Sequence, residues 1–155
     1  MNPIERPITG QEKNFDNTMH EALVEFYKAF NGRDFELMQK NWLNNKEIAM
    51  DNPLGGIKRG WSEIKSIYER IYERIFNGQA KVYVEFYDYT IVPMEGGFVA
   101  IGRERGSVEI KGKKLELAIR TSRIYKLVEG SYKQVHHHGS IEEPDLLKAY
   151  QELVK

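Results

Sequence analysis

The spacing of hydrophobic residues changes near residue 80. Before that point, hydrophobic side chains recur every three or four positions, as they do on one face of a helix. Beyond it, they recur about every second position in segments rich in Val, Tyr, Phe and Ile, as in half-buried strands. The pattern therefore predicts helices first and a sheet afterwards, which is an α+β arrangement.

Two helices are predicted near the start of the chain. Residues 18–31 carry a hydrophobic stripe, and Thr18 with Glu21 fits a capping box, in which each side chain accepts a hydrogen bond from the backbone of the other residue. A second helix follows directly, and Asp34 is placed to cap its first turn.

A turn and a third, longer helix come next. Pro53, Gly55 and Gly56 interrupt regular structure after a short strand candidate at residues 47–50. Residues 61–76 then repeat apolar side chains at helical spacing. We expect this helix to lie across the sheet, with the turn at the mouth of a pocket.

The second half of the chain predicts an antiparallel meander with glycine-containing turns. Its strands are expected at residues 81–93, 98–110, 114–128 and 132–138. A short C-terminal helix follows from Pro144. Residues 1–16 show no periodicity, so we expect a flexible arm there and a single domain over residues 17–155.

Composition narrows the class of protein. A chain of 155 residues can bury one core. Its 23 basic and 23 acidic residues balance, which disfavours nucleic acid as a partner. The lack of cysteine excludes disulfides and cysteine-bound metals. With no signal peptide and no apolar run of about 20 residues, we expect a soluble, cytoplasmic protein without a membrane partner.

Two short motifs add to the order of elements. These are DNPLGG at residues 51–56, before the third helix, and VHHHGS at residues 135–140, in the last strand. Together they resemble the nuclear transport factor 2-like superfamily, most closely SnoaL-like proteins, ketosteroid isomerase and the association domain of calmodulin-dependent kinase. The resemblance implies a cone-shaped α+β barrel. In it, N-terminal helices pack on a curved, mostly antiparallel sheet with a pocket in its concave face.

The resemblance also implies a homodimer formed through the outer face of the sheet. In this chain, that face should bury Ala118, Ser122 and Ile124 between two copies.

The isomerase motif has a catalytic Asp directly before proline, whereas Asn52 precedes Pro53 here. An amide has no useful basicity, and Asp51 should face the other side of the strand. The positions of the isomerase's two oxyanion donors match Phe26 and Arg123. This pattern does not favour ketosteroid isomerase chemistry.

The kinase association domain carries pocket arginines on adjacent strands, and Arg103 and Arg123 stand at the matching places. Its last strand has a VHxH motif, which residues 135–138 reproduce. A further pocket arginine of that family is replaced by Gly139, so any anion site should be weaker here. For Arg103, a structural ion pair is the competing interpretation.

Arg123 shares one face of its strand with mainly apolar residues. They are Leu117, Ile119, Thr121, Tyr125 and Leu127. A charge in such surroundings needs a partner. Arg123 could bind a ligand carboxylate in bidentate fashion, or it could form a structural pair with Asp51, Asp88 or Glu104.

The three consecutive histidines cannot all face the same way. If Val135 points inward, His137 reaches the pocket as a base or hydrogen-bond donor, while His136 and His138 point outward. Two histidines two residues apart can begin a metal site, but no third ligand is evident. We therefore predict no metal and no cofactor.

The predicted site combines two catalytic candidates with five ligand-binding candidates. They are His137 and Asp51 for catalysis, and Arg123, Arg103, Asn52, Trp42 and Tyr125 for binding. One hypothesis is a protein whose pocket binds a small organic molecule, such as a carboxylic acid, and that performs cofactor-free acid–base chemistry of the isomerase, lyase or hydrolase type. The alternative is a non-catalytic homo-oligomeric association module with a vestigial pocket. A cavity reached by Arg123 and one histidine would favour the first.

Overall fold

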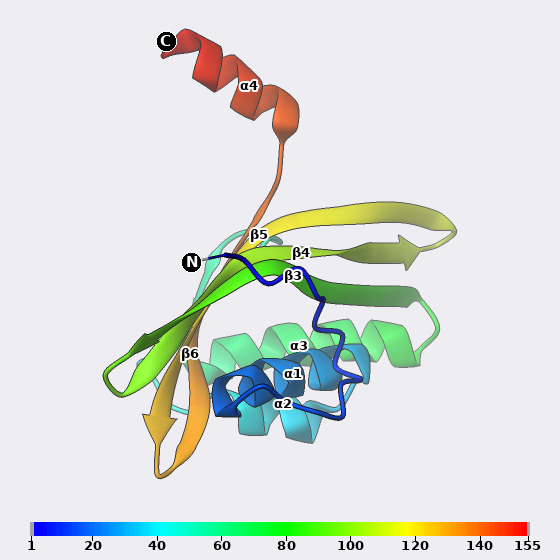
Figure 1. Cartoon of the computed structure of the whole chain (residues 1–155). Helices are drawn as coiled ribbons and strands as arrows, with labels where there is room; N and C mark the ends of the chain where they lie inside the picture. The colour runs from blue at the N-terminus through cyan, green and yellow to red at the C-terminus, as the bar shows by residue number, and fades with distance from the viewer. Residues whose placement is uncertain (1, 155) are drawn as a thin grey trace.

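The computed structural model describes residues 2–154 of the chain. Its elements, in order, are α1 (Thr18–Asn31), α2 (Phe35–Asn41), β1 (Ala49–Asp51), β2 (Ile57–Arg59), α3 (Gly60–Phe76), β3 (Ala80–Met94), β4 (Gly97–Ile110), β5 (Lys113–Val128), β6 (Ser131–Ile141) and α4 (Pro144–Leu153). The predicted order of helices before strands is confirmed (Figure 1), and β2 is an addition that the sequence did not indicate. No helix within residues 2–154 combines the length and the hydrophobicity needed to cross a membrane.

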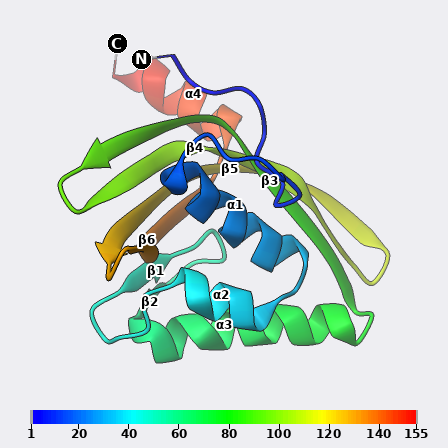
Figure 2. The same ribbon diagram turned by 60° about the horizontal axis from the view of Figure 1, so that its bottom comes forward.

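The strands form one mixed sheet in the order β2-β1-β6-β5-β4-β3. All neighbouring pairs are antiparallel except β1 and β6, which are parallel. The sheet curves around α1, α2 and α3 without closing on itself, so the helices occupy its concave side (Figure 2). This confirms the α+β class and the mostly antiparallel curved sheet.

Aromatic rings from the helices fill the space beneath the sheet. Tyr27 on α1 stacks on Phe86 of β3 at 5.7 Å between ring centroids. Phe26, one position along α1, meets Tyr68 of α3 edge-on at 6.5 Å. Such contacts between helix and strand hold α1 against the concave face, because buried aromatic rings bring large apolar area and preferred geometries.

The N-terminal arm, for which the sequence shows no periodicity, lies along the edge of the sheet in the structure. Ile4 exchanges backbone hydrogen bonds with Tyr89, and Ile8 does the same with Phe86. Ile8 is also fully buried. The reason is that β3 is the edge strand of the sheet, so its free backbone groups are open to pairing with another segment.

The helix caps are partly as predicted. Asp34 accepts a hydrogen bond from the Leu37 amide at 3.0 Å and caps α2. The predicted capping box of α1 is wrong, since the Asn17 side chain accepts from the His20 amide at 2.9 Å instead. Thr18 is already the first helical residue, which places its hydroxyl one position too late to cap.

The C-terminal helix α4 projects away from the rest of the molecule (Figure 1). Every residue from Glu143 to Val154 is exposed, including the apolar side chains of the helix. Two residues separate the end of β6 from the start of α4. Among the residues that the structure describes, α4 therefore buries no side chain against the domain.

Candidate functional site

A cavity of about 430 Å³ lies between the concave face of the sheet and helices α1 and α3. Its walls are mostly apolar side chains from β3, β4, β5 and α3. Six polar or charged side chains also reach it, namely Asn52, Tyr68, Arg74, Glu104, Arg123 and His137. The cavity is thus an apolar space with a small number of polar groups, which is the usual character of a site for an organic ligand.

His137 enters the cavity from β6 because of a bulge in that strand. Tyr125 pairs with Gln134 and Ile124 pairs with His136, so Val135 is an extra, unpaired residue. His137 then stands directly opposite Arg123 and is buried, with 5% of its surface exposed. The predicted inward direction of His137 is found, and the bulge at Val135 sets it.

The imidazole of His137 has unused hydrogen-bonding capacity. Within residues 2–154, neither Nδ1 nor Nε2 has a hydrogen-bond partner. Burial lowers the pKa of His137 well below its ordinary value of 6.5, and the positive charge of Arg123 lowers this pKa further. The ring is therefore neutral at pH 7, with one nitrogen free to accept a hydrogen bond and the other free to donate one.

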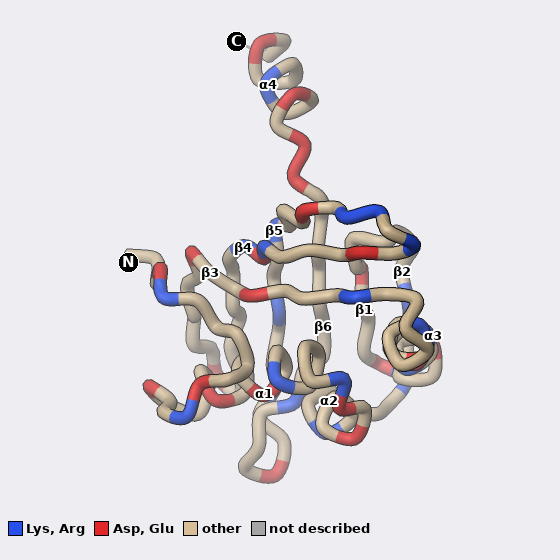
Figure 3. Tube along the Cα trace, turned by 90° about the vertical axis from the view of Figure 1, so that its right-hand side faces the viewer, with Lys and Arg blue, Asp and Glu red and all other residues tan. Residues whose placement is uncertain are grey.

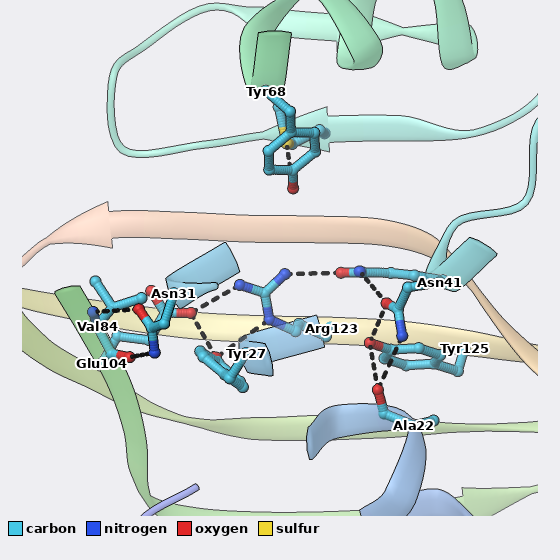
Figure 4. Close-up of polar contacts among 11 residues, drawn as sticks. Ala22, Tyr27, Asn31, Asn41, Tyr68, Val84, Glu104, Arg123 and Tyr125 are labelled. Atoms are coloured by element: carbon cyan, nitrogen blue, oxygen red, sulfur yellow. Dashed lines mark hydrogen bonds and ion pairs between the residues drawn. The ribbon is translucent and has the colours of Figure 1, made fainter. Parts of the chain in front are cut away.

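Arg123 is also buried, but its guanidinium is engaged. Nη2 donates to Oε1 of Glu104 at 2.8 Å, and Nη1 donates to Oε1 of Gln134 at 2.8 Å. Nε donates to the Tyr27 hydroxyl at 3.3 Å (Figure 4). The guanidinium also lies 3.6 Å from the ring centroid of Phe26. Of the three carboxylates considered as partners, Glu104 is the one that forms the pair.

Further hydrogen bonds extend from this arginine. The Tyr27 hydroxyl donates to Glu104 at 2.6 Å, and burial raises the pKa of Tyr27 well above 10.0, which keeps that proton in place. Oδ1 of Asn41 accepts from the Tyr125 hydroxyl at 2.8 Å and from Nε2 of Gln134 at 3.2 Å (Figure 4). We call this set the Arg123 cluster; it comprises Tyr27, Asn41, Glu104, Arg123, Tyr125 and Gln134.

Tyr125 was predicted to bind the ligand, but the structure places it in the Arg123 cluster. Its hydroxyl is committed to Asn41, and its side chain does not line the cavity. Trp42 is likewise in the core, with 1% of its surface exposed, and is not at the cavity rim. Trp42 directly follows α2 and bridges to Gln134 of β6, which draws its ring inward toward Tyr68.

The two residues of the turn before α3 face opposite ways. Asn52 is buried and lines the cavity, and its Oδ1 accepts from the Leu54 amide at 3.0 Å. Asp51 points to the outer side, where its carboxylate meets Nδ1 of His138 at 3.0 Å. Asp51, named from the sequence as a catalytic candidate, therefore does not reach the cavity.

Arg103 is also outside the cavity. It lies on the outer face of the sheet, where it pairs with Asp88 and, at 3.2 Å, with Glu142. Its neighbours Phe98, Ala100 and Glu104 are the inward residues of β4. The placement of Arg103 in the pocket is thus wrong, because its strand position puts it on the opposite face from Arg123.

The remaining histidines of the triplet have partners on the outer side. Nδ1 of His136 lies 3.0 Å from the carbonyl oxygen of Ala49, and Nε2 of His138 lies 2.6 Å from the Ser140 hydroxyl. In the part of the chain that the structure describes, no group of three or more His, Cys, Asp or Glu side chains is placed to hold a metal ion.

The fold and the cavity can now be compared with known structures. A protein with a cystatin-like fold from Caulobacter vibrioides superposes with a TM-score of 0.70 at 17% identity, covering 89% of this chain and 96% of the other. A protein from Thiobacillus denitrificans, provisionally named an association domain of calcium/calmodulin-dependent protein kinase type II, gives 0.64 at 18% identity, covering 84% and 100%.

A third similar structure is a nuclear transport factor 2-like protein from Streptomyces avermitilis that is provisionally named a dehydratase. Its TM-score is 0.65 at 16% identity, with 81% of this chain and 94% of the other covered. At these identities the likeness establishes the fold, which is that of the nuclear transport factor 2-like superfamily.

The family follows from the sequence itself. A model of the SnoaL-like domain matches residues 19–143, which is most of the chain. The chain therefore belongs to the SnoaL-like domain family. No curated protein matches it.

Proposed function

We propose that the cavity binds a small, mainly apolar organic molecule whose one polar group meets His137. The observation that carries this proposal is the buried imidazole with both nitrogens unpartnered among residues 2–154. A buried polar group without a partner costs roughly 1–3 kcal/mol, so such groups are rare unless something else satisfies them. A ligand polar group in the cavity would supply the missing partner.

The charge balance of the cavity favours a neutral ligand. Arg123 would attract a carboxylate, but Glu104 already neutralises it at 2.8 Å. A ligand carboxylate would have to compete with this buried pair and would itself lose its hydration. A carbonyl or hydroxyl group needs no countercharge, and we therefore favour a ketone-like or alcohol-like ligand over the carboxylic acid suggested by the sequence.

The same geometry supports acid–base chemistry. A neutral His137 can remove a proton from a carbon next to a carbonyl group, as in an isomerisation or an elimination. The guanidinium of Arg123 has five N–H donors, and its three described bonds leave two for an oxygen that gains negative charge. The similarity to a protein provisionally named a dehydratase agrees with the elimination class.

The association module is less well supported as the main role. A domain that serves only to assemble has no need for a cavity of about 430 Å³ that contains an unsatisfied imidazole. Dimerisation through Ala118, Ser122 and Ile124 on the outer face remains compatible with a ligand site on the concave face.

The test uses two probes that share one ring system. 2-Acetylnaphthalene carries a ketone, and 2-naphthoate carries a carboxylate on the same position. We expect the ketone to raise the midpoint of thermal unfolding, because a ligand that binds only the folded state stabilises it by mass action. The shift should be lost in His137→Phe and kept in the matched control His138→Phe, whose ring lies on the outer side.

Either of two results would contradict the proposal. One is equal stabilisation of wild type and His137→Phe by the ketone, which would show that the imidazole is not the contact. The other is stabilisation by 2-naphthoate alone, which would restore the carboxylate hypothesis. If the ketone binds as expected, exchange of its methyl protons with deuterated water, absent in His137→Phe, would test the acid–base step.

A further inference from the structure

The apolar side of α4 has no partner among residues 2–154. Leu146, Leu147, Tyr150 and Leu153 recur at helical spacing, and from 38% to 83% of their surface is exposed. A helix of ten residues alone in water is only marginally stable, so most such helices form by packing an apolar face against something else. The presence of this short helix therefore indicates that its apolar side packs against another surface.

A second group of exposed apolar side chains surrounds the mouth of the cavity. Leu54, Leu115 and Ile141 all line the cavity, yet 75%, 61% and 48% of their surfaces are exposed. They come from the turn before α3, from β5 and from the end of β6. Large apolar side chains that converge in this way at an opening mark a surface for contact.

The lead-in to α4 is held on the outer face of the sheet, away from the mouth of its own cavity. The backbone N–H of Glu142 donates to the Ala118 carbonyl at 2.9 Å. Its carboxylate accepts from Arg103 and from Arg120, both at 3.2 Å, on the outer face of the sheet. Ile141 points to the cavity and Glu142 to the opposite side, so only Glu143 is left to redirect the chain before Pro144.

The charges of the helix and the mouth are complementary. Between residues 143 and 154, α4 and its lead-in carry Glu143, Asp145 and Glu152 against a single Lys148, and these acidic positions are visible in Figure 3. The mouth carries three basic groups, one of which, Lys114, also pairs with Glu116 at 3.5 Å. They are Arg74, which lines the cavity, and Lys113 and Lys114, which precede Leu115.

We propose that α4 of each chain packs across the cavity mouth of a second copy, so that two chains exchange their C-terminal helices. Exchange of an identical element is a low-cost way to form a symmetric dimer. It also suits the geometry, because β6 ends at Ile141 on the rim of one mouth and α4 begins three residues later, at Pro144. The helix spans about 15 Å, enough to cross to an adjacent mouth. Each cavity is then completed by Leu147 and Tyr150 of the other copy.

This interface differs from a dimer through the outer sheet face, and it does not depend on what the cavity binds. Sedimentation at micromolar concentration tests it with three variants. Leu146→Ser should weaken the dimer at least tenfold, since removal of one buried apolar anchor is typically worth this much. Lys148→Ser, on the polar side of α4, and Ile124→Asp, on the outer face, should leave the dimer intact.

The absence of native cysteine allows a direct test of which chain the helix covers. In the double variant Leu115→Cys/Leu147→Cys, mild oxidation should give a disulfide-linked dimer on a non-reducing gel. The control Leu115→Cys/Lys148→Cys should link much more slowly, because position 148 faces away from the apolar side.

Three outcomes would overturn the proposal. A disulfide within one chain would show that α4 closes its own cavity. A full-length chain that sediments as a monomer and forms no cross-link would show that α4 covers some other molecule. A dimer abolished by Ile124→Asp but not by Leu146→Ser would assign the interface to the outer sheet face.

Discussion

Two buried polar regions lie side by side in the interior, and they differ in how far their hydrogen-bonding groups are satisfied. In the Arg123 cluster, the guanidinium donates to three protein groups, and the Tyr125 hydroxyl and the Gln134 amide both meet Asn41. On the paired strand, His137 is equally buried but has no partner within residues 2–154. Burial of a polar group therefore does not by itself indicate a ligand site; unused bonding capacity beside a cavity does.

The largest expected effect comes from removing the charge partner in the Arg123 cluster. Glu104→Leu leaves the guanidinium buried without a countercharge, so we expect the free energy of unfolding to fall by about 3–5 kcal/mol. Urea denaturation measures this change. The control Asp16→Asn removes the exposed Arg6–Asp16 pair and should cost less than about 1 kcal/mol.

A double variant separates the pair from its surroundings. In Glu104→Leu/Arg123→Met both charges are gone, and apolar side chains of similar size take their places. We expect it to recover most of the stability lost in Glu104→Leu, because a buried ion pair contributes little net stability compared with well-packed apolar residues. The opposite result would be a double variant that loses as much free energy of unfolding as Glu104→Leu and Arg123→Met lose together. It would show that the hydrogen bonds of the Arg123 cluster contribute more to stability than the balance of charges does.

A smaller loss is expected from Asn41→Leu. Its Oδ1 accepts from two buried donors, Tyr125 and Gln134, which would both lose this acceptor. We expect a loss of roughly 1–3 kcal/mol in the free energy of unfolding, with binding of 2-acetylnaphthalene retained. If ligand binding were lost while stability stayed unchanged, the Arg123 cluster would belong to the ligand site and the contrast between the two regions would fail.

The least damage at neutral pH is expected from His137→Phe, since the imidazole makes no hydrogen bond within residues 2–154 that the phenyl ring would break. We expect no loss in the free energy of unfolding at pH 7, because the phenyl ring replaces a buried polar group that has no partner within residues 2–154. The variant that abolishes ligand binding would thus be among the least damaging to the fold. A loss as large as that of Glu104→Leu would contradict the distinction.

The difference in free energy of unfolding between wild type and His137→Phe should depend on pH, and the pKa of His137 fixes its direction. The pKa of His137 lies below 6.5 in the folded state, so below about pH 6.5 the unfolded chain takes up a proton that the folded chain excludes. The wild-type free energy of unfolding should therefore fall relative to His137→Phe as the pH drops, by about 1.4 kcal/mol per pH unit, until the folded pKa is reached. Parallel curves for the two proteins would show that the imidazole is not protected from protonation.

The fold was largely predictable because periodicity reports which face of an element is buried. The helices, the meander and the cap at Asp34 follow from such local signals. The strand β2 was missed because three residues are too few to show a period. The pairing of Ile4 and Ile8 with β3 was missed because it depends on a strand far along the chain having a free edge.

The site was less predictable, because it depends on contacts between elements. Alternation along β5 correctly indicated that Arg123 faces inward, and Glu104 was one of its three expected partners. Gln134 and Asn41 gave no signal, since an isolated amide in a sequence does not reveal its partner. The face of Arg103 was misjudged because no residue of β4 fixes its direction until the register with β5 is known.

The unpaired Val135 has a consequence for how this site could change. With strict alternation from the inward Gln134, His136 and His138 would face the cavity and His137 would face outward. The bulge that takes up Val135 thus decides which of three adjacent histidines is presented to a ligand, while the residue types stay the same. Pairing of Val135 within the ladder, in place of the bulge, would shift the register by one residue and exchange one histidine for its neighbours, so a change in the bulge alone could alter the chemistry of this cavity.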